Sequence, residues 1–239
     1  MTTLHILHLY PKEMNLYGDH GNILTLKKRA EWRGFRVNVT EYHVGDQLPN
    51  HIDIIFGGGG QDSGQSKIEA DLRAHATELK TLIEQGTPCL VVCGLYQLFG
   101  EYFQTGDGQK IAGINILPVQ TVAGPKRLIG NIVINSPEFG EVVGYENHSG
   151  LTTLAPQAKP FGTVVSGAGN NGNDYTEGAF YKNCIGTYLH GPILPKNPRL
   201  ADFLLLKALQ RKDASIKKLA PLNDSIELHA HSVAAKRPR

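Results

Sequence analysis

The sequence has few cysteines and almost no excess charge. Its 239 residues include only 3 cysteines, too few for the disulfide framework of a secreted domain. Lys and Arg total 24 and Asp and Glu total 22, so the formal net charge is +2. A surface this close to neutral lacks the strong field that attracts nucleic acid or anionic lipid.

Long apolar runs are also missing. None approaches the roughly 18 residues that a membrane-spanning helix needs, and the start of the chain shows no basic segment followed by an apolar stretch, as a signal peptide would. We therefore expect a cytoplasmic protein with reduced thiols. The apolar share of 41% is large enough to fill one sizeable core, which excludes general disorder.

Glycine is abundant, with 27 residues, and falls mostly between short apolar runs. In the first two-fifths of the chain, strand and helix patterns alternate. The strands are expected at residues 4–10, 35–39, 52–56 and 89–92, and the helices at residues 23–33 and 66–85. This alternation predicts an α/β fold with a mostly parallel open sheet and helices on both faces.

The second half has a different pattern. Strands are expected at residues 111–116, 128–134, 142–146, 161–165 and 184–189, and a last helix from Pro198 to about Arg211. The first four follow one another without helices, which predicts an antiparallel extension of the same sheet. We expect one domain over residues 1–220 and a partly disordered tail over residues 221–239.

Three features fall where parallel strands are expected to end, and ligands bind at that edge of an open sheet. Gly57–Gly60 follows one strand, Cys93 another and His190 a third. A thiol between a strand and a helix N-terminus is favoured as thiolate, a histidine can serve as its base, and glycine amides can bind an oxyanion. Together they indicate a thiol nucleophile with its base.

Each feature also has a structural interpretation. Cys93 and His190 could each be an ordinary buried residue with a structural role. We assign that role to Cys89 and Cys184, because both lie within expected strands. The glycines are compatible with a simple turn. They do not form a phosphate-binding loop, because Gln65-Ser66 stands where that motif has Lys-Ser.

Five motifs, in order, resemble class I glutamine amidotransferases. They are residues 14–22 (MNLYGDHGN), 56–62 (FGGGGQD), 93–97 (CGLYQ), 144–150 (GYENHSG) and 188–191 (YLHG). The branch they resemble is related to cobyric acid synthase and includes the glutaminase subunits of lipid II isoglutaminyl synthases. The resemblance covers residues 4–210 and implies a flavodoxin-like fold.

The resemblance also implies roles for individual residues. Cys93 would form a glutamyl thioester with glutamine, and His190 would transfer the protons. Arg127 would bind the substrate α-carboxylate, and Gln97 would line the pocket. The amides of Gly94 and of Gly58 or Gly59 would bind the oxyanion. Ammonia would pass to a Mur-ligase-like partner, which carries ATP and magnesium and amidates the D-glutamate of lipid II, whereas this chain would need no cofactor.

The third member of the triad is not evident from the sequence. Many class I enzymes have an acid two residues after the histidine, where this chain has Pro192. The resemblance implies that the ligase partner supplies it, with Asp19, Asp62 and Glu146 as candidates within the chain. Two other functions stay open, a glutaminase serving another synthetase such as a corrinoid amidase, and a non-catalytic α/β binding module. A protease of similar fold is a weaker possibility.

Overall fold

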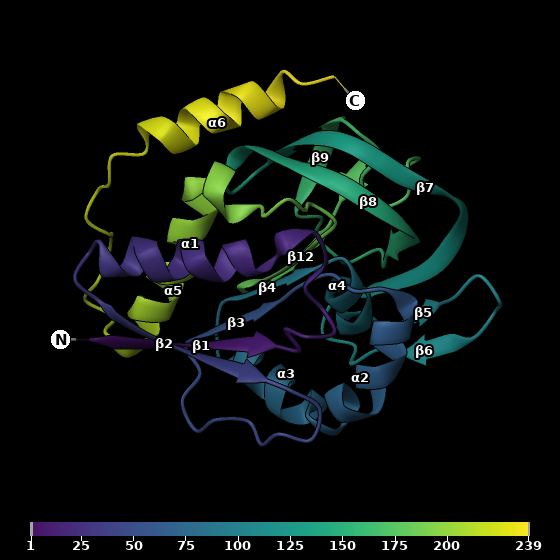
Figure 1. The fold of residues 1–239 in the computed structure, drawn as a ribbon, viewed down its shortest axis with the longest axis horizontal. Coiled ribbons are helices and arrows are strands. Elements are labelled where there is room, and N and C mark those ends of the chain that lie inside the picture. Colours follow the sequence, from purple (N-terminus) through teal and green to yellow (C-terminus); the bar gives the residue numbers. More distant parts are fainter. Residues whose placement is uncertain (1, 239) are drawn as a thin grey trace.

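The computed structural model describes residues 2–238 and contains two six-stranded sheets (Figure 1). The first consists of β1 (Thr3–Leu9), β2 (Arg36–Tyr42), β3 (Ile54–Gly57), β4 (Cys89–Val92), β11 (Ala179–Tyr181) and β12 (Cys184–Thr187). Its order is β11-β12-β4-β3-β1-β2, and all neighbours are parallel except β11 with β12. The order β2-β1-β3-β4-β12 is that of flavodoxin-like sheets, so the predicted fold class is confirmed.

Helices cover both faces of this sheet. The helices α1 (His20–Glu31) and α5 (Pro198–Lys212) lie on one face, and α2 (Asp62–Ala74) and α3 (Ala76–Glu84) lie on the other (Figure 1). The prediction of a single helix at residues 66–85 was wrong in two respects. The helical segment starts earlier, at Asp62, and it is interrupted at His75, whose backbone leaves the helical region. The ring of His75 forms a hydrogen bond with Glu78 in the next helix.

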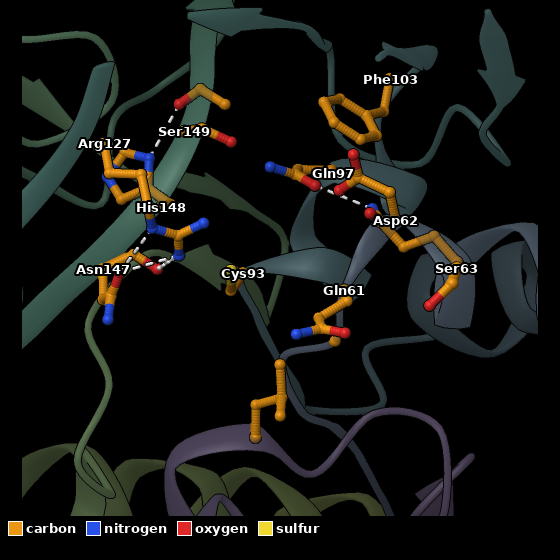
Figure 2. Close-up of a pocket in the computed structure, with 14 residues that line it drawn as sticks. Gln61, Asp62, Ser63, Cys93, Gln97, Phe103, Arg127, Asn147, His148 and Ser149 are labelled. Carbon is orange, nitrogen blue, oxygen red and sulfur yellow. Dashed lines mark hydrogen bonds between the residues drawn. The ribbon is translucent and has the colours of Figure 1, made fainter. Parts of the chain in front are cut away.

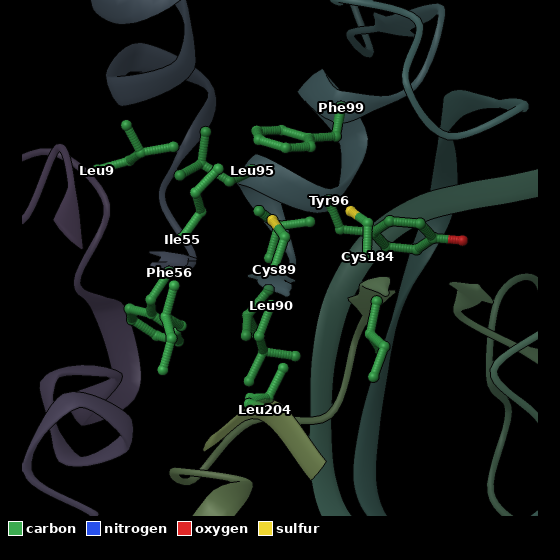
Figure 3. Packing of buried hydrophobic residues seen from close by; sticks show 14 of the residues in the cluster. Leu9, Ile55, Phe56, Cys89, Leu90, Leu95, Tyr96, Phe99, Cys184 and Leu204 are labelled. Atoms are coloured by element: carbon green, nitrogen blue, oxygen red, sulfur yellow. The ribbon is translucent and has the colours of Figure 1, made fainter. Parts of the chain in front are cut away.

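The strands of the first sheet are apolar on both sides because helices cover both faces. Every residue of β3, β4 and β12 is buried, and their side chains pack against Leu9, Leu95 and Leu204 (Figure 3). Cys89 and Cys184 are register partners in this core and have no exposed surface. Burial raises the pKa of the Cys89 thiol, so the assignment of both as core residues is confirmed.

The expected antiparallel extension of the same sheet is corrected. The strands β5 (Tyr102–Gln104), β6 (Lys110–Ala112), β7 (Val119–Ser136), β8 (Gly140–Leu154), β9 (Gly162–Ser166) and β10 (Thr176–Glu177) form a separate, mainly antiparallel sheet. Because β12 and β11 already occupy the edge beside β4, only β11 extends the first sheet. The long β7–β8 hairpin arches over the ends of the first sheet (Figure 1). The short helices η1 (Leu16–Gly18), α4 (Gly94–Phe99) and η2 (Leu194–Lys196) lie in the connections.

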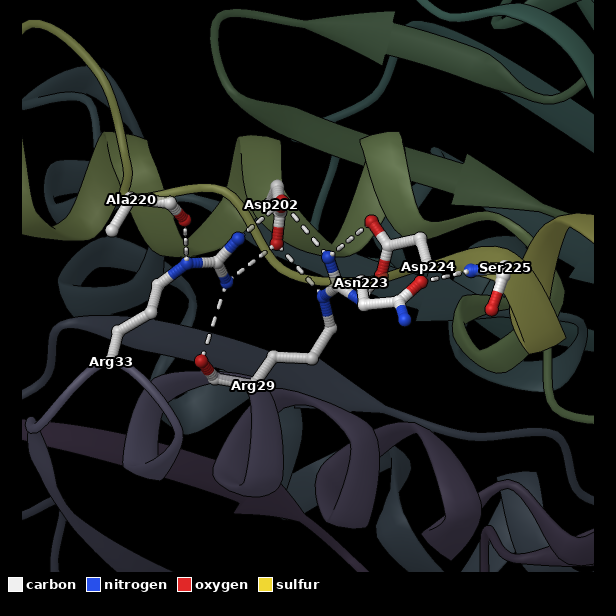
Figure 4. Close-up of polar contacts among 7 residues, drawn as sticks. All are labelled: Arg29, Arg33, Asp202, Ala220, Asn223, Asp224 and Ser225. Carbon is white, nitrogen blue, oxygen red and sulfur yellow. Dashed lines mark hydrogen bonds and ion pairs between the residues drawn. The ribbon is translucent and has the colours of Figure 1, made fainter.

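The tail expected to be partly disordered contains a helix, α6 (Ser225–Ala235), although Arg239 lies outside the described residues. This helix buries none of its residues. Polar contacts hold its start instead. Arg29 is 2% exposed and donates to Asp202 (2.8 Å) and Asp224 (2.6 Å), while Arg33 binds Asp202 (2.7 Å) (Figure 4).

We predict that Asp202→Ala destabilises the fold by about 3 kcal/mol, the usual effect of removing one partner of a buried ion pair. Arg29 and Arg33 both lose a carboxylate in this variant, and both guanidinium groups are buried. Urea unfolding of the variant measures the loss. The exposed Glu138→Ala serves as the control and should change stability by less than about 0.5 kcal/mol. Equal stability of the two variants would contradict the role of this cluster.

Candidate active site

Cys93 lies in a sharp turn between β4 and α4. Its backbone has φ 48° and ψ −104°, a strained conformation for a residue other than glycine. The Cys93 N–H donates to the carbonyl of Thr187 at 2.8 Å, which joins the ends of β4 and β12. A strained strand-to-helix turn of this kind exposes a nucleophile above the sheet. Leu95 packs against Gly57, so the turn forms with a leucine at position 95.

His190 follows β12 and is fully buried. Its backbone N–H donates to the carbonyl of Tyr145 (2.8 Å) and its carbonyl accepts from the Tyr145 N–H, so β8 fixes its position. The imidazole contacts the Cys93 sulfur. Burial alone would lower the pKa of His190, but the charges of Cys93 and Asp19 outweigh it and raise the pKa to about 10. The protonated form of the His190 ring is therefore favoured at neutral pH.

Asp19, the residue before α1, is the acid that the fold brings to this pair. It is fully buried, and its Oδ1 lies 3.7 Å from Nδ1 of His190. Its Oδ2 accepts the N–H of Gly59 at 2.7 Å. One carboxylate therefore touches both the base and the glycine loop. Glu146, another in-chain candidate, accepts the N–H groups of Ala168 (2.8 Å) and Gly169 (2.9 Å).

The glycine loop passes directly beside the reactive groups. A Cβ on Gly59 would lie 2.7 Å from Cε1 of His190 and 3.2 Å from Cβ of Cys93. The Gly59 N–H already binds Asp19, so Gly59 is not an available oxyanion donor, contrary to our expectation. The next amide, that of Gly60, lies 3.0 Å from the place of a Cβ on Gly94. Within residues 2–238 the Gly60 amide makes no hydrogen bond. Gly58 packs on Asp19.

A cavity of about 440 Å³ opens above Cys93. Figure 2 shows Arg127, Asn147, His148 and Ser149 on one side and Gln61, Asp62, Ser63 and Gln97 on the other, with Cys93 between them. Arg127 lies where the β7–β8 pairing shifts register between Ala123 and Leu128. Such an irregularity turns a side chain away from its regular direction. Both Nε and Nη2 of Arg127 donate to Asn147 Oδ1, at 2.9 and 2.7 Å.

Gln97 is held in the cavity wall by a buried chain of polar groups. Gln65 donates to its Oε1 (2.8 Å), and its Nε2 donates to the hydroxyl of Tyr188 (3.1 Å), which also bonds Thr152. Our sequence reasoning missed Gln65 and Asn147. Asn147 lies in a motif quoted above, but Gln65 had entered only as a departure from a phosphate-binding loop. Their positions depend on elements that are distant in the chain.

No group of three or more His, Cys, Asp or Glu side chains in the described part of the chain is arranged to hold a metal ion. Likewise, none of the helices within residues 2–238 combines the length and apolar character needed to span a membrane.

Comparison with known proteins gives a consistent result. Residues 5–198 match the family model for the CobB/CobQ-like glutamine amidotransferase domain. The chain is 42% identical to the lipid II isoglutaminyl synthase (glutamine-hydrolyzing) subunit GatD of Staphylococcus aureus strain N315, over 99% of this chain and 97% of that protein. It is 43% identical to the protein of the same name from Streptococcus pneumoniae strain R6, over 87% of this chain and 82% of that one.

A solved structure described as a glutamine amidotransferase shares the fold. It superposes with a TM-score of 0.61 at 14% identity, covering 84% of this chain and 98% of that one.

The site also contains a buried carboxyl that titrates unusually. Burial raises the pKa of Glu177 to about 8, although its bonds to the Tyr188 N–H (2.6 Å) and the Thr187 hydroxyl lower it. The folded state therefore binds this proton more tightly than the unfolded state does, and this stabilisation is present at low pH. It is lost as the pH rises from about 4.5 to about 8.

We predict that Glu177→Gln raises the Tm at pH 9 and leaves it equal or lower at pH 5. The amide keeps an acceptor for Tyr188 and Thr187 without the cost of a buried charge. Thermal unfolding at the two pH values measures the effect, with the exposed Glu138→Gln as the control. A Tm difference that is the same at both pH values would show that the Glu177 carboxyl does not titrate in this range.

Proposed function

The chain belongs to the CobB/CobQ-like glutamine amidotransferase family, and from this premise we propose that it hydrolyses the side-chain amide of L-glutamine and supplies ammonia to a separate synthetase subunit. The observation that carries the proposal is the strained Cys93 in contact with the buried His190 at the base of a cavity that Arg127 also lines. A non-catalytic module would have no need of this strain.

In the first half of the reaction, the Cys93 thiolate attacks the amide carbon of glutamine. A C–S bond forms, and the carbonyl electron pair moves to the oxygen. The amides of Gly94, at the N-terminus of α4, and of Gly60 bind this oxyanion. His190 donates its proton to the amide nitrogen, the C–N bond breaks, and ammonia leaves a glutamyl thioester.

In the second half, neutral His190 takes a proton from water as the oxygen attacks the thioester carbon. The C–S bond then breaks, glutamate leaves, and the sulfur is again a thiolate beside a protonated imidazole. Asp19 holds the ring in place through Nδ1 in both halves, the task that a carboxylate performs in hydrolase triads.

The cavity binds glutamine along its length. Arg127 is oriented by Asn147, to which its Nε and Nη2 donate, and it binds the α-carboxylate through Nη1 in a charge-assisted hydrogen bond. Gln97 is fixed at both ends of its amide and forms the wall beside the substrate side chain.

For the acceptor of ammonia we propose the D-glutamate of lipid II. Support comes from the relatives of similar length, which are named as subunits of lipid II isoglutaminyl synthase. The partner would be a Mur-ligase-like synthetase that uses ATP and magnesium to activate the acceptor carboxylate, and the two chains would form a heterodimer that serves cell-wall biogenesis.

We predict that an electrophilic glutamine analogue adds one equivalent of mass to the wild-type chain and none to Cys93→Ala. Glutamine hydrolysis should be lost in the same variant, while its circular dichroism spectrum stays unchanged. Intact-protein mass spectrometry measures the adduct, with Cys184→Ala as the thiol control that keeps labelling. Labelling of Cys93→Ala, or no labelling of wild type with its partner synthetase present, would refute the proposal.

We further predict that Asp19→Asn lowers kcat about 100-fold with little change in KM, because the base loses its orienting charge. Lower charge beside His190 also lowers the pKa of the ring, so the alkaline limit of activity moves to lower pH. Asp53→Asn provides the control, since Asp53 is a buried carboxylate that binds the His5 N–H elsewhere. Unchanged kcat in the complex would assign the orienting role to an acid of the partner.

A further inference from the structure

The cavity above Cys93 contains two side chains with fixed and opposite formal charge, Arg127 and Asp62. They lie on opposite sides of it, with Cys93 between them (Figure 2). His148 adds no charge at neutral pH, because burial lowers its pKa to about 3. Apart from the Cys93–His190 pair, the walls therefore offer one cation and one anion and no net charge.

Asp62 has no structural partner that would account for it. Its carboxylate makes no hydrogen bond or ion pair within residues 2–238; only its main-chain carbonyl is used, by the hydroxyl of Ser66. An acid in the first turn does favour a helix, and Asp62 begins α2. That effect needs no particular direction of the side chain, whereas this one lines the cavity. The loop from Gly58 to Gly60 ends two residues earlier, so the exposed Asp62 lies close in the chain to the glycines beside Cys93 and His190.

A free amino acid carries opposite charges on one carbon, a carboxylate and an ammonium. With Arg127 on the carboxylate and the amide carbon over Cys93, the ammonium of glutamine faces the other wall. We propose that Asp62 binds this α-ammonium group and makes the site selective for free glutamine. The inference rests on the glutaminase function proposed above. Glutamine within a peptide, which lacks both charges, would lose both contacts and would not be hydrolysed.

The test compares L-glutamine with glutaramic acid, which has the same amide and carboxylate but no α-amino group. Both are assayed with the chain in complex with its partner synthetase, as wild type, Asp62→Asn and Glu138→Gln. Glu138 is an exposed acid outside the cavity, so its variant is the control for the loss of one carboxylate. Wild type should prefer glutamine by at least about tenfold in kcat/KM, the value of one charge-assisted hydrogen bond.

In Asp62→Asn we expect KM for glutamine to rise about tenfold, kcat to change less than twofold, and the preference over glutaramic acid to fall by the same factor as kcat/KM. Glu138→Gln should stay within twofold of wild type. A second readout needs no turnover: calorimetry should find glutamine bound about tenfold more weakly by Cys93→Ala/Asp62→Asn than by Cys93→Ala.

Equal losses on both substrates would overturn the proposal, because a merely structural role of Asp62 impairs both alike. Unchanged KM and unchanged affinity would also overturn it, and both results leave the glutaminase function standing. If the wild-type complex neither hydrolyses glutamine nor reacts with the electrophilic analogue, the proposed function itself fails, and this inference fails with it.

Discussion

The site depends on the absence of a side chain at Gly59. Asp19, Cys93 and His190 come from three distant parts of the chain, and all three approach within 3.4 Å of the place where a Cβ on Gly59 would lie. Any larger residue would push His190 away from Cys93 or Asp19 away from His190. The same glycine donates its N–H to Asp19, so the loop both leaves the space and fixes the acid that occupies part of it.

Sequence reasoning singled out Cys93 and His190 from their local patterns, and the structure brings the two side chains together. Cys93 and His190 each follow a short apolar strand, and the ends of parallel strands meet at one edge, so two patterns sufficed. Asp19 was only one of three candidate acids, because its approach to His190, 171 residues away, follows from strand order and helix packing. The separate second sheet and α6 were not predicted, for a related reason. Strand pairing is non-local, and α6 buries none of its residues and is held by Arg29 and other polar contacts.

Buried charged groups have opposite effects on stability at Arg29 and at Glu177. Arg29, on α1, binds the carboxylates of Asp202 and Asp224 and so ties the start of α6 to α1 and α5, and its burial is compensated. Glu177 accepts hydrogen bonds from an N–H and a hydroxyl, and Glu146 raises its pKa further. This carboxyl costs stability above pH 8, yet it holds the backbone of Tyr188, two residues before the base. Stability and the position of the base are therefore in conflict at Glu177.

The two sheets contribute different residues to the cavity. The first sheet places Cys93 and His190 at its strand ends, whereas Arg127 and Asn147 come from the β7–β8 hairpin of the second. The cavity therefore depends on how the two sheets are placed relative to each other, and the paired backbones of Tyr145 and His190 link them. A shift of the hairpin would move Arg127 and His190 together. With the roles proposed above, a partner subunit that contacts the hairpin would act on substrate binding and on proton transfer at once.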